Sequence, residues 1–508
     1  MKQLDFSFSD FINNEHNLIF LVGAGCSIDP PSCLPAGRSM IKSILKFCCA
    51  ENELVRLLKL KDLRFEMLVE IFQDYIDRDL KVIEFYAQCK KPNLQHHFLA
   101  DMIKKGHIVM TTNFDNLIEI ALLESGVRKG EILPVITKKD FKSFNNPKEL
   151  IKENKKPLFK IHGSFENIIT GINTKDSLVA TIRSIGRNKE GSNIFQIESF
   201  KQELFNNVPE NSSLIIMGYS GSDDFDIIPT LKIWKKINKL IWINHTKSYK
   251  GKPCFYQFDC SDSKINNNNH VDKVLMDIYQ NGFIQQIYRL DCNTSSLIGS
   301  LPSLNPNIDK ESFSLNPGVW LKENIDIPNN FINYFIPSLI YKNLNEYDES
   351  FRCSKKILNL NKFDSINIWR ARALNNIGFI YEIRGNFNRA LNNYREALKI
   401  DNQIQNINDK QSHLNNIASL YEKQGIYQKS LRLFKQALSI SISLKDKRGE
   451  ATYLNNIGMI YNNLGKYQDA LKYVNNSLRI RKLFGVTRHR TLLLLCEINA
   501  NRKFRSRN

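Results

Sequence analysis

Two short motifs in the first half of the chain contain residue types and spacings suited to chemistry. The first, Gly-Ala-Gly-Cys-Ser at residues 23–27, directly follows the apolar run 18–22. Glycines after a strand allow a backbone to come close to a pyrophosphate. The second, Thr-Thr-Asn-Phe-Asp at residues 111–115, follows the apolar run 108–110 and places a carboxamide and a carboxylate two residues apart. Together the motifs predict a dinucleotide pocket with chemistry at the far end of the dinucleotide.

The apolar runs before these motifs belong to a wider pattern of strands that alternate with helices. Such continuous runs fit strands that are buried on both faces of a parallel sheet. Residues 40–105 show a helical pattern instead, which predicts a helical insertion covering one side of the pocket. We therefore expect an α/β domain with a parallel sheet over residues 1–292. The strand candidates are residues 18–22, 108–111, 158–161, 214–217, 240–244 and 284–290.

The C-terminal part of the chain contains an internal repeat with a spacing of 40 residues. Leu-Asn-Asn-Ile recurs at residues 374–377, 414–417 and 454–457, and tyrosines, turn glycines and small residues follow at the same offset. Each unit is predicted to be a helix, a tight turn and a second helix. One such pair cannot bury its apolar face, but stacked pairs can. The tyrosines are Tyr341, Tyr381, Tyr421 and Tyr461, and the glycines are Gly385, Gly425 and Gly465.

This repeat resembles the tetratricopeptide repeat, with a longer connection than its usual period of roughly 34 residues. We expect an all-α solenoid over residues 331–508 that ends in a basic capping helix. Residues 293–330, rich in Asn, Ser and Pro, are predicted to be a linker. Tetratricopeptide arrays bind protein segments in a concave groove, so the resemblance implies a protein partner.

Composition places the chain among soluble globular proteins of two or three domains, with 508 residues and 42% hydrophobic content. The polar N-terminus and the lack of a long apolar run predict neither a secretory signal nor a membrane span. Ten scattered cysteines without a Cys-x-x-Cys pair favour free thiols in the cytoplasm and argue against a metal site.

Positive charge is concentrated near the C-terminus. The net charge is +19, and over residues 371–508 Lys and Arg outnumber Asp and Glu by 24 to 9. A basic domain attracts polyanions such as nucleic acid, although a charged helical surface explains the same bias. Few aromatic residues interleave with the terminal run 502–507, which weakens the case for stacking on single strands.

Six motifs in this order resemble the sirtuin superfamily over roughly residues 18–245. This family binds NAD in a Rossmann-like domain and breaks the bond between nicotinamide and ribose, so the resemblance implies NAD+ as a substrate. It places Gly23, Ala24, Gly25 and Ser27 at the pyrophosphate, Gly218 and Ser220 at phosphate or ribose, and Asn244 at the adenosine ribose. The motifs are residues 23–27, Pro-Asn-Leu-Gln-His at 92–96, residues 111–115, Lys-Ile-His-Gly-Ser at 160–164, Gly-Tyr-Ser at 218–220 and Ile-Asn at 243–244.

The resemblance also assigns the reacting groups. Asn113 lies beside the nicotinamide ribose, Asp115 faces the nicotinamide carboxamide, and His162 is the base. Departure of nicotinamide leaves positive charge on the ribose, and a carboxamide with an imidazole suits the positioning and deprotonation of the incoming oxygen. Alternatively, Asn113 caps the following helix and His162 is a satisfied core histidine. His96 is expected to begin a helix rather than to perform chemistry.

Differences between this sequence and the protein-deacylating sirtuins reduce the range of activities to be expected. Protein-deacylating sirtuins carry a zinc ribbon with two cysteine pairs after the catalytic histidine, but no cysteine lies between Cys89 and Cys254. Residues 218–224 and the fusion to tetratricopeptide repeats resemble bacterial anti-phage defence effectors. We therefore expect an NAD+ hydrolase (NADase) that acts in abortive infection and yields ADP-ribose and nicotinamide. Its activity would depend on a homo-oligomer or on a phage-derived trigger bound by the repeats.

Two other functions remain open from the sequence. One is an NAD-dependent protein deacylase or ADP-ribosyltransferase, with the repeats recruiting its substrate. The other is a non-catalytic scaffold that senses NAD or ADP-ribose. Use of NADP is likewise open.

Overall fold

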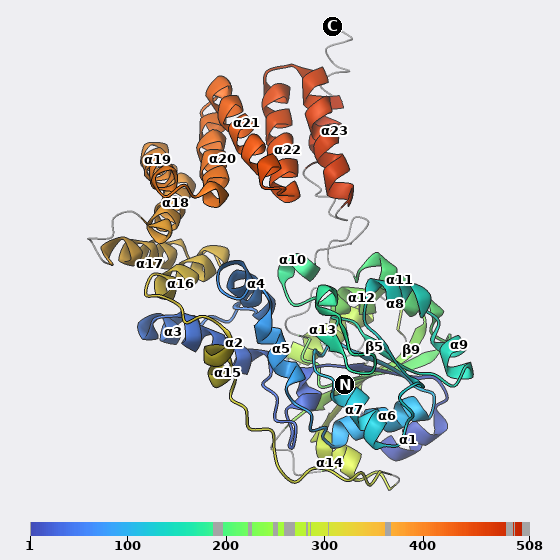
Figure 1. Cartoon of the computed structure of the whole chain (residues 1–508). Coiled ribbons are helices and arrows are strands. Elements are labelled where there is room, and N and C mark those ends of the chain that lie inside the picture. Colours follow the sequence, from blue (N-terminus) through green and yellow to red (C-terminus); the bar gives the residue numbers. More distant parts are fainter. Residues whose placement is uncertain are drawn as a thin grey trace. The chain divides into compact units, whose positions relative to one another are not determined.

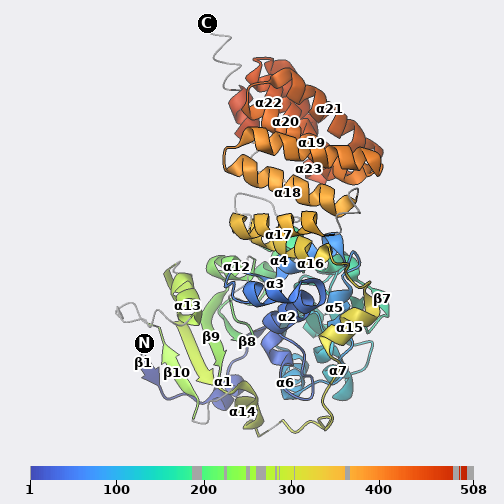
Figure 2. The ribbon, with the colours of Figure 1, turned by 90° about the vertical axis from the view of Figure 1, so that its left-hand side faces the viewer.

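The chain folds into two compact units. The first consists of Met1–Ile44 and Arg64–Asp326, and the second of Leu45–Leu63 and Ile327–Asn508. Figure 1 and Figure 2 show a sheet with helices in the first unit and consecutive helices in the second. The computed structural model describes residues 2–185, 197–221, 226–246, 252–258, 270–280, 283–284, 286–302, 304–360, 367–483, 491 and 493–499.

A nine-stranded sheet forms the centre of the first unit, in the order β1-β10-β11-β9-β8-β2-β3-β5-β4. From β11 to β4 neighbouring strands are parallel, whereas β10 and β1 extend one edge in antiparallel fashion. This topology confirms the predicted α/β fold with a parallel sheet. The strands are β1 (Lys2–Leu4), β2 (Leu18–Val22), β3 (Ile108–Thr111), β4 (Ile132–Val135), β5 (Lys156–Lys160), β8 (Ser212–Met217), β9 (Ile237–His245), β10 (Cys254–Gln257) and β11 (Gln286–Cys292).

The side chains of β2 alternate between two apolar cores, one on each face of the sheet. Phe20 packs in the core that α6 (Leu94–Lys104) and α7 (Leu117–Glu124) cover. Leu21 packs in the core on the other face. Because successive strand residues point to opposite faces, burial on both faces requires an uninterrupted apolar run. The second face is covered by α8 (Lys138–Ser143), α11 (Ser199–Asn207), α12 (Ile227–Ile233) and α13 (His270–Gln280).

The segment predicted as a helical insertion is divided between the two units. Residues 45–63, with α3 (Glu51–Leu57), belong to the second unit. There the fully buried carboxylate of Glu53 accepts two hydrogen bonds of 2.6 Å from Arg352. The other helices of the segment are α2 (Gly37–Cys48), α4 (Phe65–Tyr75), α5 (Lys81–Ala87) and α6.

The residues predicted as a linker are partly helical. Up to Asp326 they belong to the first unit, where α14 (Thr294–Gly299) contacts α6 and α15 (Pro317–Asn324) contacts α5. The indole nitrogen of Trp320 donates to the carbonyl of Lys81 at 3.3 Å. The predicted linker therefore contains two ordered helices, α14 and α15, which pack on the first unit although its composition is rich in Asn, Ser and Pro.

The second unit is a solenoid of helix pairs, as the 40-residue repeat predicts. The turn inside each pair places a residue in the left-handed region, with φ values of +74° at Gly385, +73° at Gly425 and +70° at Gly465. Glycine occupies that region at no steric cost. The helices are α16 (Ile332–Asn343), α17 (Tyr347–Asn359), α18 (Ile368–Ile383), α19 (Phe387–Gln403), α20 (Ile407–Lys423), α21 (Tyr427–Ser443), α22 (Lys447–Asn463) and α23 (Tyr467–Leu483).

The predicted basic capping helix is described in part. Residues 493–499 are helical, and Leu494 and Ile498 pack against α23. The basic run 502–507 lies outside the described residues. Among the helices that are described, none combines the length and the apolar character needed to cross a membrane.

Candidate functional site

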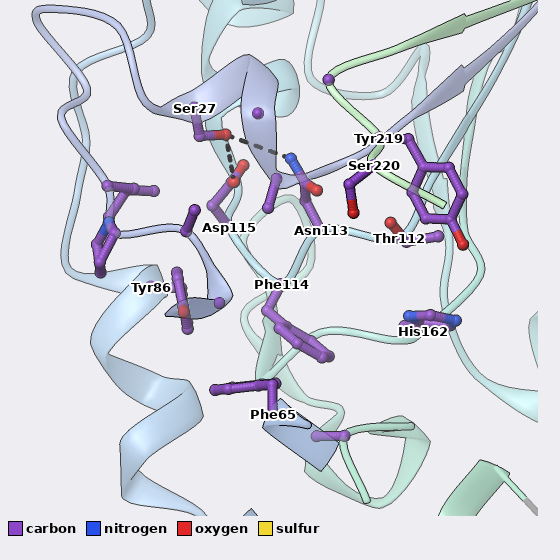
Figure 3. A pocket seen from close by; sticks show the side chains of 18 of the residues that line it. Ser27, Phe65, Tyr86, Thr112, Asn113, Phe114, Asp115, His162, Tyr219 and Ser220 are labelled. Carbon is purple, nitrogen blue, oxygen red and sulfur yellow. Dashed lines mark hydrogen bonds between the residues drawn. The ribbon is translucent and has the colours of Figure 1, made fainter. Parts of the chain in front are cut away.

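A cavity of about 300 Å³ lies in the first unit at the carboxyl edge of the parallel sheet. The loops after β2, β3, β5 and β8 surround it, because the carboxyl ends of parallel strands meet at one edge. Figure 3 shows Asn113 and His162 among the side chains of this cavity. Eight of the ten residues assigned by sequence line it: Ala24, Gly25, Ser27, Asn113, Asp115, His162, Gly218 and Ser220.

A second cavity of about 420 Å³ adjoins the first. Asn244, at the end of β9, lines this second cavity and donates to Asp291 at 2.8 Å. Gly25, Gly218 and Ser220 line both cavities. The assigned residues thus follow one edge of the sheet, and Gly23 is the member that lines neither cavity.

The glycines of the first motif have a packing role that the sequence did not reveal. A Cβ on Gly23 would lie 2.7 Å from the Gly218 carbonyl oxygen, and one on Gly25 would lie 2.8 Å from the Gly218 Cα. The Gly25 amide donates to the same carbonyl at 2.6 Å. Glycine is therefore required here because the loops after β2 and β8 touch. Approach to a pyrophosphate remains a prediction for these residues.

Ser27 is the hub of a buried hydrogen-bond network. Its hydroxyl donates to Asp115 Oδ2 at 2.8 Å, and Asn113 Nδ2 donates to Ser27 Oγ at 3.3 Å (Figure 3). His96 Nε2 lies 3.1 Å from the same oxygen. The network fixes the orientation of the Asn113 amide, with its nitrogen toward Ser27.

The protonation of His96 follows from its neighbours. Its Nδ1 accepts the backbone N–H of Asn93 at 3.1 Å, so the proton of the neutral ring lies on Nε2 and is donated to Ser27. Burial lowers the pKa of His96 to about 4, which keeps the ring neutral at pH 7. His96 therefore cannot take the Ser27 proton, and this pair is no activated nucleophile.

His96 begins α6, as expected, but the sequence analysis missed its contact with Ser27. The Asn93 side chain accepts the backbone N–H of His96 at 3.3 Å, which completes a capping box with the bond from Asn93 to His96 Nδ1. The spacing Asn-x-x-His was the available signal for the cap. Nothing local indicated that the other ring nitrogen reaches Ser27.

Asn113 presents an unsatisfied acceptor. The residue is 6% exposed, and within the described residues its Oδ1 has no hydrogen-bond partner. In Figure 3 this oxygen points away from Ser27, toward the side of the cavity where Ser220 lies. Leaving a buried acceptor unpaired costs about 1–3 kcal/mol unless a ligand or water donates to it. The alternative role as a helix cap does not apply, because Asn116 occupies the N-cap of α7.

His162 is paired with a carboxylate that the sequence analysis did not single out. Its Nε2 lies 3.3 Å and 3.4 Å from the two carboxylate oxygens of Asp226, which is 3% exposed. A carboxylate at Nε2 orients the ring and leaves Nδ1 as the nitrogen that can accept a proton. The side chain of His162 is 15% exposed and lines the cavity, so it is not an enclosed core histidine.

Aromatic rings form an apolar wall opposite the polar groups. Phe65, Tyr86 and Phe114 line the first cavity, with ring centroids of Tyr86 and Phe114 6.2 Å apart (Figure 3). Burial and the nearby Asp115 raise the pKa of Tyr86 well above its usual range, so the phenol stays protonated. Such a wall suits a flat heteroaromatic ring.

Among the described residues, no group of three or more His, Cys, Asp or Glu side chains is arranged to hold a metal ion. The cavity instead contains one imidazole–carboxylate pair and one carboxamide network. This donor set suits hydrogen bonding and proton transfer.

Comparison with known proteins identifies both parts of the chain. A SIR2-like domain model matches residues 107–240, and tetratricopeptide repeat models match residues 371–403 and 409–483. The comparison with curated proteins gives no match. The chain thus combines a SIR2-like domain, of the kind related to NAD use, with tetratricopeptide repeats, as the motifs and the 40-residue period predicted.

Similar solved structures each cover about a third of the chain. BtubC (BKLC) from P. vanneervenii is 19% identical over 34% of this chain and 72% of its own, with a TM-score of 0.29. The apo form of RapI is 18% identical over 34% and 65%, with a TM-score of 0.32. A Rap protein in complex with competence and sporulation factor is 15% identical over 34% and 48%, with a TM-score of 0.30. The family-model matches, the sheet and the helix pairs make this chain a SIR2-like domain fused to a tetratricopeptide solenoid.

Proposed function

We propose that this chain is an NAD+ hydrolase that releases nicotinamide and ADP-ribose with water as the acceptor. The observation that carries the proposal is the unsatisfied Oδ1 of Asn113 in the same cavity as the His162–Asp226 pair. An acceptor without a partner and a base with an orienting carboxylate are the two groups that hydrolysis of a glycosidic bond needs.

The adjoining cavities suit an extended dinucleotide. The nicotinamide riboside half would occupy the first cavity, against the aromatic wall, and the adenosine half the second, beside Asn244. The pyrophosphate would lie at the rim that Gly25, Gly218 and Ser220 share. Volumes of about 300 and 420 Å³ fall in the range of small-molecule pockets.

The reaction can be followed atom by atom. The bond between C1′ of the ribose and the nicotinamide nitrogen breaks, and its electron pair leaves with nicotinamide. A water molecule donates one O–H to Asn113 Oδ1, directly or through a ribose hydroxyl, and its oxygen is thereby oriented toward C1′. As the new C–O bond forms, the proton passes to His162, whose ring Asp226 orients. ADP-ribose, nicotinamide and one proton are the products.

The acceptor side of the cavity favours water over a protein substrate. The Val179 N–H donates to the His162 carbonyl at 2.9 Å, and Val179 and Ala180 line the cavity. Both amino groups of the Arg183 guanidinium donate to the carboxylate of Asp74 on α4, at 3.0 and 2.7 Å. An acylated peptide would have to displace the segment 179–183, which these contacts hold in place, whereas a water molecule would not.

Nicotinamide release separates this function from its alternatives. The purified full chain is incubated with NAD+, with and without an acetylated peptide and with and without a phage lysate as the source of a trigger, and the products are separated by chromatography. Hydrolysis without peptide is expected, and it should be lost in Asn113→Ala and in His162→Ala. The exposed residues Asn13 and His16 provide matched controls, Asn13→Ala and His16→Ala, which should keep full activity. Turnover that requires the peptide, or full activity in both site variants, would contradict the proposal.

The biological role we propose is anti-phage defence by NAD+ depletion. Its support is the union of this site with tetratricopeptide repeats, because such repeats are a common platform for protein binding. A phage-derived protein bound by the repeats, or assembly of the chain into a homo-oligomer, would switch hydrolysis on. Cellular NAD+ is measured before and during phage challenge, with Asn113→Ala cells as the control. A fall that occurs equally in both cell lines would contradict this role.

A further inference from the structure

Two lysine side chains are buried beneath the candidate catalytic loops. Lys160 is the last residue of β5 and is fully buried, and Lys201 on α11 is 2% exposed. Lysine is almost never fully buried unless its ammonium group is paired. The burial of these two ammonium groups is therefore unfavourable unless each is paired with acceptors in the fold.

The ammonium group of Lys160 holds the loop that carries Asn113. It donates to the main-chain carbonyl of Asp115, to Asn116 Oδ1 at 3.1 Å and to Glu119 Oε1 at 3.0 Å. These three bonds use all three protons of the group. The loop after β3 is thereby tied to β5 within two residues of His162.

The ammonium group of Lys201 holds the main chain beside His162. It donates to the carbonyl of Ile161 at 2.6 Å and forms an ion pair with Glu198. It also lies 5.4 Å from the ring centroids of Phe141 and Phe200. The peptide that joins Ile161 to His162 is therefore fixed from α11, on the other side of β5 from the Lys160 contact.

We propose that Lys160 and Lys201 are positioning residues of the hydrolytic site, each holding a main-chain carbonyl within two residues of one of its reacting side chains. This inference rests on the proposed function. Glu119 and Glu198 balance the two ammonium charges, so the lysines act through placement and add no net charge beneath the ribose. Such positioning matters because the reaction rate depends strongly on geometry: a misplacement of a reacting group by about 1 Å can lower the rate 10²-fold.

The test replaces whole pairs rather than single partners. A lone Lys160→Met leaves Glu119 buried and unpaired, which threatens folding. The double variants K160M/E119L and K201M/E198L remove both charges and keep the volume. Lys239 and Glu15 form a chemically matched pair, 2.5 Å apart, near the amino end of β9 and away from the cavity edge. K239M/E15L is therefore the control.

The kinetic result distinguishes positioning from stability. Each site pair is expected to lower kcat about 10²-fold, measured below the thermal midpoint of the variant, while KM for NAD+ changes less than about threefold. Hydrogen exchange should accelerate over residues 111–117 in the first variant and over 159–164 in the second. Wild-type kcat in both variants, or an equal loss in the control, would overturn the inference.

Failure of the proposed function gives a different pattern. If the wild-type chain releases no nicotinamide either with or without the phage lysate, the hydrolase proposal fails, and NAD+ affinity measured by calorimetry becomes the readout. Faster exchange confined to the two loops, with weaker NAD+ binding than in the control, then still supports positioning of a binding site. Unchanged exchange and unchanged affinity would overturn it.

Discussion

The cavity of the first unit and the helix pairs of residues 367–483 differ in the distance along the chain that their polar contacts span. In the site, Ser27 bonds Asp115 across 88 residues, and His162 pairs with Asp226 across 64. In the repeats, corresponding carboxamides on successive helix pairs bond across 41 residues, as Asn416 does to Asn375. A site built from distant segments is disturbed as a whole by one substitution, whereas damage to a repeat stays local.

The largest effect is expected at the imidazole–carboxylate pair. His162→Ala should lower kcat about 10³-fold, and Asp226→Asn about 10²-fold, because the base is lost in one and left without its orienting charge in the other. The double variant should be no slower than His162→Ala alone, since the two residues act as a unit. Steady-state kinetics of nicotinamide release measures the cycle, and additive losses would break the assignment.

Acid should destabilise the first unit through His96. Its folded pKa of about 4 lies below the unfolded value of about 6.5, so the unfolded chain binds more protons between these values. The free energy of unfolding should therefore fall by up to about 3 kcal/mol as pH drops from 6.5 to 4. Urea unfolding at pH 7 and pH 5 measures the change. His96→Gln should flatten the dependence more than the exposed control His16→Gln does.

Overpacking a repeat should lower the stability of the repeats and leave the rate of hydrolysis unchanged. A Cβ on Gly378 would lie 2.7 Å from the buried ring of Tyr394. Gly378→Ala is expected to cost about 1–3 kcal/mol of repeat stability while kcat without a trigger stays at the wild-type value. Thermal unfolding with parallel kinetics checks both, and Ser443→Ala, at an exposed residue whose hydroxyl donates within its own helix, is the control. A large fall in kcat would contradict this prediction, because it would mean that the packing of the repeats influences the site even without a trigger.

A smaller effect on turnover than at the imidazole–carboxylate pair is expected at Ser27, the hub of the hydrogen-bond network. Ser27→Ala removes the acceptor of Asn113 Nδ2 and the donor to Asp115 Oδ2, but leaves both side chains in place. We expect kcat to fall about tenfold, because orientation is loosened rather than lost. Ser43→Ala, at a hydroxyl that donates to the Ser39 carbonyl of its own helix at 3.2 Å, is the matched control. A loss as large as that of His162→Ala would give Ser27 a direct part in the reaction.

Sequence predicted the elements whose physical signal is local. The central strands β2, β3, β5, β8, β9 and β11 were found because burial on both faces requires continuous apolar runs. The repeat was found because its period recurs. Strands β1, β4 and β10 were missed, being short strands toward the edges of the sheet, and β4 contains Pro134, which a sheet tolerates at its edge.

The candidate site was predictable only as a set of motifs. Asn113 and His162 were assigned by resemblance, and the structure brings both to one cavity. The contact of His96 with Ser27, the pairing of Asp226 with His162 and the burial of Lys160 were not predicted. Each depends on segments that meet only in the folded sheet, and no spacing along the chain encodes such a meeting.

The placement of α3 has a consequence for how such a chain can be divided. Residues 45–63 leave the first unit in sequence and fold with the second, where Glu53 is matched by Arg352. A truncation after Asp326 would remove Arg352 and also α16, against which α3 packs, and would leave α3 without its partners. The SIR2-like part therefore cannot be separated by a single cut in the chain. A graft of the solenoid onto another protein must include residues 45–63 as well.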